Sequence, residues 1–263
     1  MNSYFTINVC VANVYSNNDF DSSVLTQALL GESCLILDEV PKWVKIRQED
    51  GYEGWINRFY GIISNKIYDS NNICDDLNHV VYQDKGLTIP MRELTFGNQL
   101  KTEKLKDCLK VTLPDGFIGW TSCKTRQTPN KIDRESLLIL AQNFLGCQYL
   151  WGGKSPKGFD CSGLIQTVFH AFGIMLPRDS KDQSNYFISS LIDKNKAKMG
   201  DLHFFGVKGK VSHIAIANEN GKYIHSQGFV KEESFNKSDI NFNADLFNTH
   251  LHSVSIENIL SVD

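Results

Sequence analysis

No run of apolar residues in this sequence approaches the roughly 20 that a helix needs to cross a bilayer. The 263 residues carry 27 basic and 30 acidic side chains, which gives a formal net charge of −3. This balance provides no excess of positive charge for binding nucleic acid or an anionic membrane surface. We therefore expect neither nucleic acid nor a membrane as a partner.

The sequence also lacks any Cys-x-x-Cys pair, although it has seven cysteines: Cys10, Cys34, Cys74, Cys108, Cys123, Cys147 and Cys161. Their odd number and scattered spacing argue against a structural zinc site or a disulfide framework. We expect no metal and no other cofactor, and a reducing compartment suits free thiols. The N-terminus has neither the basic region nor the apolar core of a signal peptide, so we expect a cytoplasmic protein. An exported protein is the alternative if a leader preceded residue 1.

Two stretches of the N-terminal half share one turn sequence. Asp50-Gly-Tyr-Glu-Gly-Trp-Ile56 matches Asp115-Gly-Phe-Ile-Gly-Trp-Thr121, and each follows short runs in which apolar and polar residues alternate. Asp-Gly between such runs is a strong hairpin signal. An internal repeat of this kind predicts two copies of one small all-β barrel, over residues 1–63 and 64–125.

Helical signals come first and strand signals afterwards in the remaining region, residues 131–263. A polar linker that contains Pro129 precedes it. Asp133 is a good cap for a helix that ends at Gly146, and the sequence turns to strand-like runs after Gly200. Segregated helices and strands are typical of an α+β domain.

Cys161 follows an irregular, glycine-rich stretch and directly precedes a helical pattern. Asp160 is a good N-cap, and apolar residues then recur at helical spacing until Gly173. The cysteine therefore lies in the first helical turn, where the positive end of the helix dipole favours a thiolate. This is a position suited to a nucleophile, although an inert buried cysteine is the commoner finding.

Two histidines flank a predicted hairpin turn at 218–221. A two-residue turn would place His225 opposite Ile216, whereas a longer loop would place it opposite Ile214 or His213. In the longer-loop case the two imidazoles share one face of the sheet. His213 would then be the general base for the cysteine, and His225 would orient His213.

Several motifs occur in one order and resemble NlpC-type papain-like cysteine peptidases. They are Tyr149-x-Trp-Gly-Gly, Phe159-Asp-Cys-Ser-Gly-Leu164, Leu176-Pro-Arg-Asp-Ser180, Gly200-Asp-Leu and Ser212-His-Ile-Ala. The repeated Asp-Gly-aromatic-x-Gly-Trp turn resembles bacterial SH3-like domains. Together these resemblances imply an α+β papain-like cysteine peptidase domain preceded by two small all-β SH3-like barrels.

The resemblance also implies catalytic roles. The cysteine of the Asp-Cys-Ser-Gly motif is the family's nucleophile, which corresponds to Cys161. The first hairpin histidine, His213, would be the base, and His225 on the following strand would orient it. Tyr149 would contribute to the oxyanion site.

Two SH3-like units ahead of such a domain are similar to the subgroup that cleaves the γ-D-glutamyl–diamino acid bond of murein peptides with a free N-terminal L-alanine. This implies that Asp160 and Ser162 bind the ammonium group. The pocket would also be lined by Trp151 and Ser180 and closed by Tyr52 of the first barrel, and Glu32 is the candidate for an acidic residue of that barrel that contributes to it. A carboxylate facing an ammonium group selects free chain ends, since an acylated nitrogen would leave the carboxylate without its partner.

The expected function is therefore a cysteine endopeptidase acting on murein peptides, with cell-wall recycling as its role. One alternative is a secreted peptidoglycan hydrolase that acts on intact wall. Another is a wall-peptide-binding scaffold without catalysis, although the presence of Cys161, His213 and His225 argues against it. Asp160 alone would also be explained as a helix cap, and Arg178 as a structural partner of a carboxylate.

Overall fold

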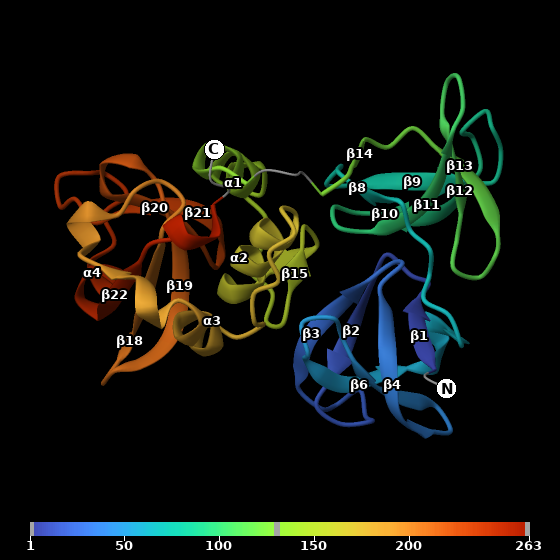
Figure 1. The fold of residues 1–263 in the computed structure, drawn as a ribbon, viewed down its shortest axis with the longest axis horizontal. Helices are drawn as coiled ribbons and strands as arrows, with labels where there is room; N and C mark the ends of the chain where they lie inside the picture. Colours follow the sequence, from blue (N-terminus) through green and yellow to red (C-terminus); the bar gives the residue numbers. More distant parts are fainter. Residues whose placement is uncertain (1–2, 129–131, 261–263) are drawn as a thin grey trace. The chain divides into compact units, whose positions relative to one another are not determined.

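The computed structural model describes residues 3–128 and 132–260 (Figure 1). The chain divides into two compact units, Met1–Gln127 and Thr128–Asp263. The linker residue Pro129 and the predicted domain start at residue 131 lie outside the described residues. The first unit contains only strands and one 3-10 helix, and the second combines helices with a sheet.

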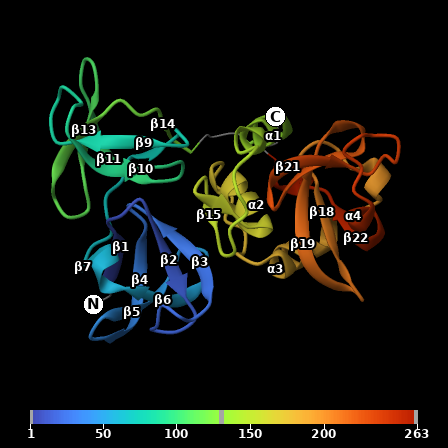
Figure 2. The same ribbon diagram turned by 180° about the vertical axis from the view of Figure 1, so that it is seen from behind.

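The first barrel has seven strands in the order β3-β2-β6-β5-β4-β1-β7 (Figure 2). Their bounds are β1 (Tyr4–Ile7), β2 (Val11–Tyr15), β3 (Val24–Leu29), β4 (Ser33–Val40), β5 (Trp43–Arg47), β6 (Glu53–Asn57) and β7 (Gly61–Ser64), with a 3-10 helix at Arg58–Tyr60. Alternate side chains point inward, as the period of two in a strand requires. Phe5, Val44, Ile46 and Ile56 are completely buried in the resulting core.

The second barrel repeats the strand order of the first with each strand number raised by seven, β10-β9-β13-β12-β11-β8-β14. Its strands are β8 (Asn72–Cys74), β9 (His79–Tyr82), β10 (Pro90–Leu94), β11 (Gln99–Lys104), β12 (Leu109–Thr112), β13 (Ile118–Thr121) and β14 (Thr125–Arg126). The shared order confirms that the internal repeat of the sequence encodes two copies of one fold.

The repeated turn has the same geometry in both barrels. The carboxylates of Asp50 and Asp115 each accept a hydrogen bond from the backbone N–H two residues on, at 2.9 and 3.1 Å. The following residues, Gly51 and Gly116, have φ values of 84° and 85°. An L side chain is strained in this left-handed region, so the turn favours glycine at this position, and the preceding aspartate supplies the hydrogen bond.

The two barrels pack into one unit. Leu30, which belongs to the first barrel by sequence, is fully buried in the core of the second. Asn98 Nδ2 donates a 2.8 Å hydrogen bond to the carbonyl oxygen of Cys10, and Asn8 Nδ2 donates to Asp115 at 2.7 Å.

The second unit is built around the six-stranded antiparallel sheet β17-β22-β18-β19-β20-β21. The sheet strands are β17 (Leu191–Ile192), β18 (Leu202–Val207), β19 (Lys210–Ala217), β20 (Lys222–Gln227), β21 (Phe229–Ser234) and β22 (His250–Val254). The α-helices are α1 (Arg134–Asn143), α2 (Cys161–His170), α3 (Ser180–Tyr186) and α4 (Ala244–Thr249). A small hairpin, β15 (Lys154–Ser155) and β16 (Gly158–Phe159), precedes α2, and short 3-10 helices lie at Ile188–Ser190, Lys194–Lys196, Glu219–Gly221 and Glu257–Ile259. This arrangement confirms the α+β papain-like fold.

Helix α2 packs against β19 and β20, which brings its N-terminus to the strands that carry the two histidines. Its apolar residues Leu164, Ile165, Val168 and Phe169 are fully buried. Over residues 3–128 and 132–260, no helix combines the length and the apolar character that crossing a membrane would require.

The helix signals of the sequence are confirmed for α1 and α2. Asp133 caps α1 by accepting a 2.8 Å hydrogen bond from the N–H of Ser136. Helix α3 was not predicted, because its sequence is polar throughout. The side chains that it buries are Gln183 and Ser184, so no apolar period marks it.

The predicted register of the histidine hairpin is wrong by one residue. Ile216 pairs with Ile224. His225 is therefore not opposite Ile216, Ile214 or His213, the three residues that the alternatives gave. The reason is a three-residue turn, Glu219–Gly221, whose last two residues have positive φ values of 58° and 73°. His213 and His225 nevertheless share one face of the sheet, as the longer-loop alternative required.

Candidate active site

Cys161 is the first residue of α2 and is nearly buried, with 8% of its surface exposed. The backbone N–H groups of Ile214 and Ser162 donate hydrogen bonds to its sulfur. Ile214 directly follows His213 on β19, so the fold brings the predicted nucleophile beside the predicted base. This meeting depends on α2 packing against β19 and not on any spacing in the sequence.

Burial controls the electrostatics of this pair. It raises the pKa of the Cys161 thiol to about 11, and the carboxylate of Asp160 adds to the shift. Burial likewise lowers the pKa of His213 to about 3, with the neighbouring His225 contributing. Both groups are therefore uncharged at neutral pH, and desolvation outweighs the helix dipole that favoured a thiolate in the sequence argument.

The two histidines form the first part of a hydrogen-bonded chain. His213 Nε2 lies 2.8 Å from His225 Nδ1, with the two rings nearly perpendicular at 88°. His225 is completely buried, and its Nε2 lies 3.0 Å from Oε2 of Glu233. Glu233 in turn contacts Lys231 Nζ at 2.8 Å and Asn243 Nδ2 at 2.5 Å.

Glu233 was not predicted as a site residue. On the hairpin of β20 and β21, His225 pairs with Lys231 and Tyr223 pairs with Glu233, so Glu233 lies diagonally across from the histidine on the same face. The signal was present in the sequence as Gly228, which has a φ of 75° and ends β20 with a tight turn. Recognising that turn would have set the register of β21.

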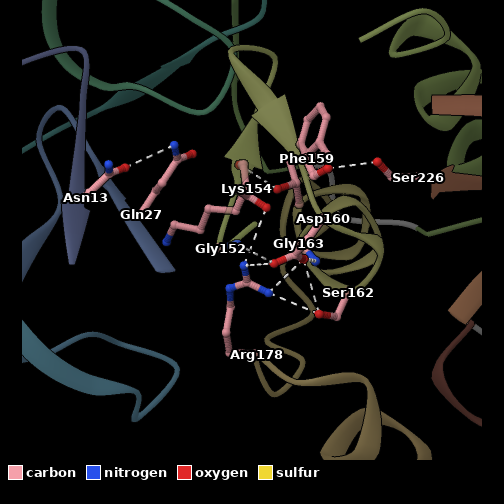
Figure 3. A network of polar contacts seen from close by, with 12 residues as sticks. Asn13, Gln27, Gly152, Lys154, Phe159, Asp160, Ser162, Gly163, Arg178 and Ser226 are labelled. Atoms are coloured by element: carbon pink, nitrogen blue, oxygen red, sulfur yellow. Dashed lines mark hydrogen bonds and ion pairs between the residues drawn. The ribbon is translucent and has the colours of Figure 1, made fainter. Parts of the chain in front are cut away.

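Asp160 is enclosed by donors, as Figure 3 shows. Its Oδ1 accepts hydrogen bonds from Gly163 N at 2.6 Å, Arg178 Nη1 at 3.0 Å and Ser162 Oγ at 3.2 Å. Its Oδ2 accepts from Arg178 Nη2 at 2.5 Å and Gly152 N at 3.0 Å. A carboxylate offers about four acceptor positions, so an ammonium group would have to displace one of these donors.

The Asp160–Arg178 pair is deeply buried, with exposed side-chain fractions of 11% and 1%. This is the bidentate geometry in which a guanidinium binds a carboxylate most strongly. Arg178 therefore has the structural partner that the sequence suggested. The direct ammonium contact of Asp160 stays a prediction.

The other predicted residues of this unit differ in their surroundings. Ser162 is buried and also accepts a 3.0 Å hydrogen bond from Arg178. Burial raises the pKa of the Tyr149 phenol, and the charges of Cys161 and Asp160 add to this shift. Trp151 is largely exposed, and Ser180 is half-buried as the first residue of α3.

Tyr52 and Glu32 lie in the first barrel, and Gln48 links them. The Gln48 N–H donates to the carbonyl oxygen of Tyr52 at 2.9 Å, and its Nε2 donates to Glu32 at 3.0 Å. Gln48 thus connects the two segments that carry these residues. Their predicted contribution to the pocket of the second unit stays a prediction.

Within the part of the chain that the structure describes, no group of three or more histidine, cysteine or acidic side chains is arranged to hold a metal ion. All seven cysteines are free thiols.

Comparison with known proteins agrees with this geometry. Residues 146–245 match the model of the NlpC/P60 family, and residues 14–58 match the bacterial dipeptidyl-peptidase SH3 domain. A γ-D-glutamyl-L-lysine dipeptidyl-peptidase of Bacillus cereus is 30% identical over 76% of this chain and 66% of its own length. A protein of the same name from Bacillus subtilis is 28% identical over 78% of this chain and 73% of its own length.

The fold is also found in a solved structure, that of an NlpC/P60 family protein from Bacillus cereus. It is 22% identical, covers 96% of this chain and 99% of its own, and superimposes with a TM-score of 0.83. The family predicted from the motifs is thus confirmed. The chain belongs to the NlpC/P60 family of cysteine peptidases and carries bacterial SH3-like domains ahead of its papain-like domain.

Proposed function

We propose that this chain is an endopeptidase that hydrolyses the γ-D-glutamyl–L-diamino acid bond of murein peptides with a free N-terminal L-alanine. The observation that carries the proposal is that Ile214, the residue after His213, donates its backbone N–H to the sulfur of Cys161 at the start of α2, while His213 is hydrogen-bonded to His225. A nucleophile, a base and a group that orients the base are the elements of acyl transfer through a covalent intermediate.

The geometry supports a concerted first step. Since Cys161 and His213 are both uncharged at rest, His213 removes the thiol proton as the sulfur attacks the γ-carbonyl carbon. We assign the stabilisation of the oxyanion to Tyr149 and the N–H groups at the start of α2. His213 then protonates the leaving amino group as the C–N bond breaks. Water deprotonated by His213 hydrolyses the thioester and restores the thiol.

The substrate class follows from the relatives. Two of them are named γ-D-glutamyl-L-lysine dipeptidyl-peptidases, which are proteins that remove a dipeptide before a lysine. We propose the same bond type here, with lysine or another diamino acid on the leaving side. A dipeptidyl-peptidase must recognise a free chain end, and we assign this recognition to Trp151, Ser162 and Ser180; the contribution of Tyr52 and Glu32 stays an expectation from the sequence.

Recycling of imported wall fragments inside the cell is the role that we propose for such an activity. A requirement for a free N-terminal L-alanine suits fragments already cut from the glycan, because in intact wall that nitrogen is acylated. Hydrolysis of intact wall outside the cell is the alternative, and it predicts a site that accepts acylated peptides.

The test compares L-Ala-γ-D-Glu-L-Lys and L-Ala-γ-D-Glu-diaminopimelate with their N-acetylated forms, using mass spectrometry of the products. We expect release of L-Ala-D-Glu from the free peptides alone. Cleavage of the acetylated forms at a similar rate would favour the wall hydrolase. If no peptide is cleaved while the thiol is shown to be reduced, the binding scaffold replaces the enzyme.

Cys161→Ala is the first control for this experiment. We expect it to abolish turnover and to retain the fold, because alanine fits the first turn of a helix and Cys161 is a free thiol that forms no disulfide. Cys147→Ala is the matched control, since Cys147 is a half-buried thiol of the same unit and should leave turnover unchanged. Full activity of Cys161→Ala would contradict the nucleophile assignment.

A further inference from the structure

Glu233 is not the nucleophile, the base or the orienting residue of the proposed reaction, yet several hydrogen bonds hold its side chain in place. Lys231 Nζ contacts its Oε1 at 2.8 Å, while Asn243 Nδ2 donates to its Oε2 at 2.5 Å. Burial opposes ionisation here, but the hydrogen bonds from His225, Lys231 and Asn243 prevail and lower the pKa of Glu233 to about 2. The side chain is therefore a carboxylate and can only accept hydrogen bonds.

The positions of the histidine protons follow from that carboxylate. A neutral imidazole carries one proton, so one ring nitrogen donates and the other accepts. Because Glu233 only accepts, the proton of His225 must be on Nε2, 3.0 Å from the carboxylate. Nδ1 of His225 is then an acceptor, and it takes the hydrogen bond of His213 Nε2 at 2.8 Å.

His213 therefore has its single proton on Nε2, and its Nδ1 is the unprotonated nitrogen. That is the nitrogen left to receive the proton of Cys161, because the other is committed to His225. We infer that Glu233 is a positioning residue that fixes the tautomers of both histidines so that His213 presents a bare Nδ1 to the nucleophile. This inference rests on the proposed cysteine peptidase function.

Glutamine would not reproduce this arrangement. Both oxygens of Glu233 face donors: Oε1 faces Lys231, and Oε2 faces His225 and Asn243. An amide has one oxygen and one NH₂, so in either orientation Glu233→Gln sets a donor against a donor. With NH₂ toward His225, the tautomer of that histidine reverses and the change passes on to His213.

The test uses the full-length protein labelled with ¹⁵N-histidine. Long-range ¹H–¹⁵N correlation spectra distinguish the tautomers of each ring, and His213→Gln and His225→Gln spectra assign the signals. In the wild type we expect Nε2–H for both His213 and His225. In Glu233→Gln we expect signals of the Nδ1–H form to appear for both.

The matched control is Glu232→Gln on the same strand. Glu232 contacts Asn218 at 2.6 Å and Lys222 at 3.1 Å and has no contact with His225. The Glu232→Gln variant should therefore leave the tautomers of His213 and His225 unchanged. If Glu233→Gln does not fold, the wild-type spectrum still decides, because an Nδ1–H form of His213 there would overturn the inference.

Turnover gives a second readout. In a Ser-His-Asp triad, loss of the correct histidine tautomer costs about 10⁴-fold in kcat. Glu233 contacts the orienting residue His225 and not the base itself, so its effect should be smaller. We expect Glu233→Gln to lower kcat roughly 10- to 100-fold with KM little changed. A variant with wild-type kcat and unchanged tautomers would overturn the inference. If the wild type cleaves no murein peptide, the proposed function fails, yet the spectra still test the tautomers independently.

Discussion

The hydroxyl of Ser226 donates a 2.7 Å hydrogen bond to the carbonyl oxygen of Phe159 (Figure 3). Phe159 is two residues before Cys161, and Ser226 directly follows His225. Both are completely buried. This bond therefore ties the segment that carries the nucleophile to the strand that carries the second histidine.

Ser226→Ala tests that connection. The substitution removes one of two donors to the Phe159 carbonyl oxygen, which keeps the N–H of Leu150 at 3.1 Å, so we expect a cost of about 1 kcal/mol of unfolding free energy. Because Cys161 is positioned through the same segment, kcat should fall several-fold while KM changes less. Urea unfolding and steady-state kinetics measure the two effects. Ser212→Ala, at an exposed position of β19, is the control, and an unchanged kcat in Ser226→Ala would show that α2 alone positions the cysteine.

Alkylation of Cys161 reports the state of its thiol. Burial raises its pKa to about 11, and the thiolate is the reactive form. The thiolate fraction at pH 7 is then on the order of 10⁻⁴, and each pH unit raises it tenfold. We expect the rate of iodoacetamide labelling at Cys161, followed by peptide mass spectrometry, to rise through pH 9 without levelling.

A plateau in that rate between pH 4 and pH 8 would contradict the uncharged pair. It would show that Cys161 and His213 exist as thiolate and imidazolium before substrate binds. Cys147 in the same digest is an internal reference, because it is a half-buried free thiol of the same unit.

His203 gives a pH dependence of stability that is independent of the active site. It is 2% exposed, its Nδ1 lies 2.8 Å from Ser253 Oγ, and burial, with His250 and Lys194 contributing, lowers its pKa to about 3. The unfolded chain binds a proton near pH 6.5 that the folded chain excludes until about pH 3. The unfolding free energy should therefore fall by on the order of 1 kcal/mol per pH unit as the pH drops through this window.

Urea unfolding at pH 7, 6 and 5 measures this dependence. His203→Gln removes the titrating group while retaining a polar side chain for Ser253, so its stability should change less over the same range. Equal slopes in the wild type and the variant would assign the acid sensitivity to other groups, with His213 and His250 as the next candidates because their pKa values are also lowered, to about 3 and about 4.

The sequence predicted what depends on local signals and on motif order. The two barrels followed from the repeated Asp-Gly turn, and Cys161 at the start of a helix followed from Asp160 and the apolar period of α2. The register of the histidine hairpin could not be predicted, because it depends on Asn220 adopting a left-handed φ of 58°. Glu233 was missed for a related reason, since its diagonal contact with His225 exists only once β21 is in register.

Two hypotheses explain the role of Asp160. As an ammonium ligand it would select free N-termini, whereas as a cap and partner of Arg178 it would hold the loop before Cys161 in place. Asp160→Asn leaves the buried guanidinium without its carboxylate partner, and breaking a buried pair in this way costs about 3–5 kcal/mol. We therefore expect a large loss of stability in this variant, measured by thermal and urea unfolding.

The double variant Asp160→Asn/Arg178→Gln distinguishes the two roles. Removing both charges together should restore part of the stability, since no unpaired buried charge remains. The ratio of kcat/KM for the free and N-acetylated peptides is then compared between this folded variant and the wild type. If Asp160 binds the ammonium group, the preference for the free peptide should fall by tenfold or more, about 1.4 kcal/mol. If the preference is retained while kcat falls, Asp160 acts through the backbone it caps, and recognition of the chain end belongs to other groups, with Glu32 the first to test.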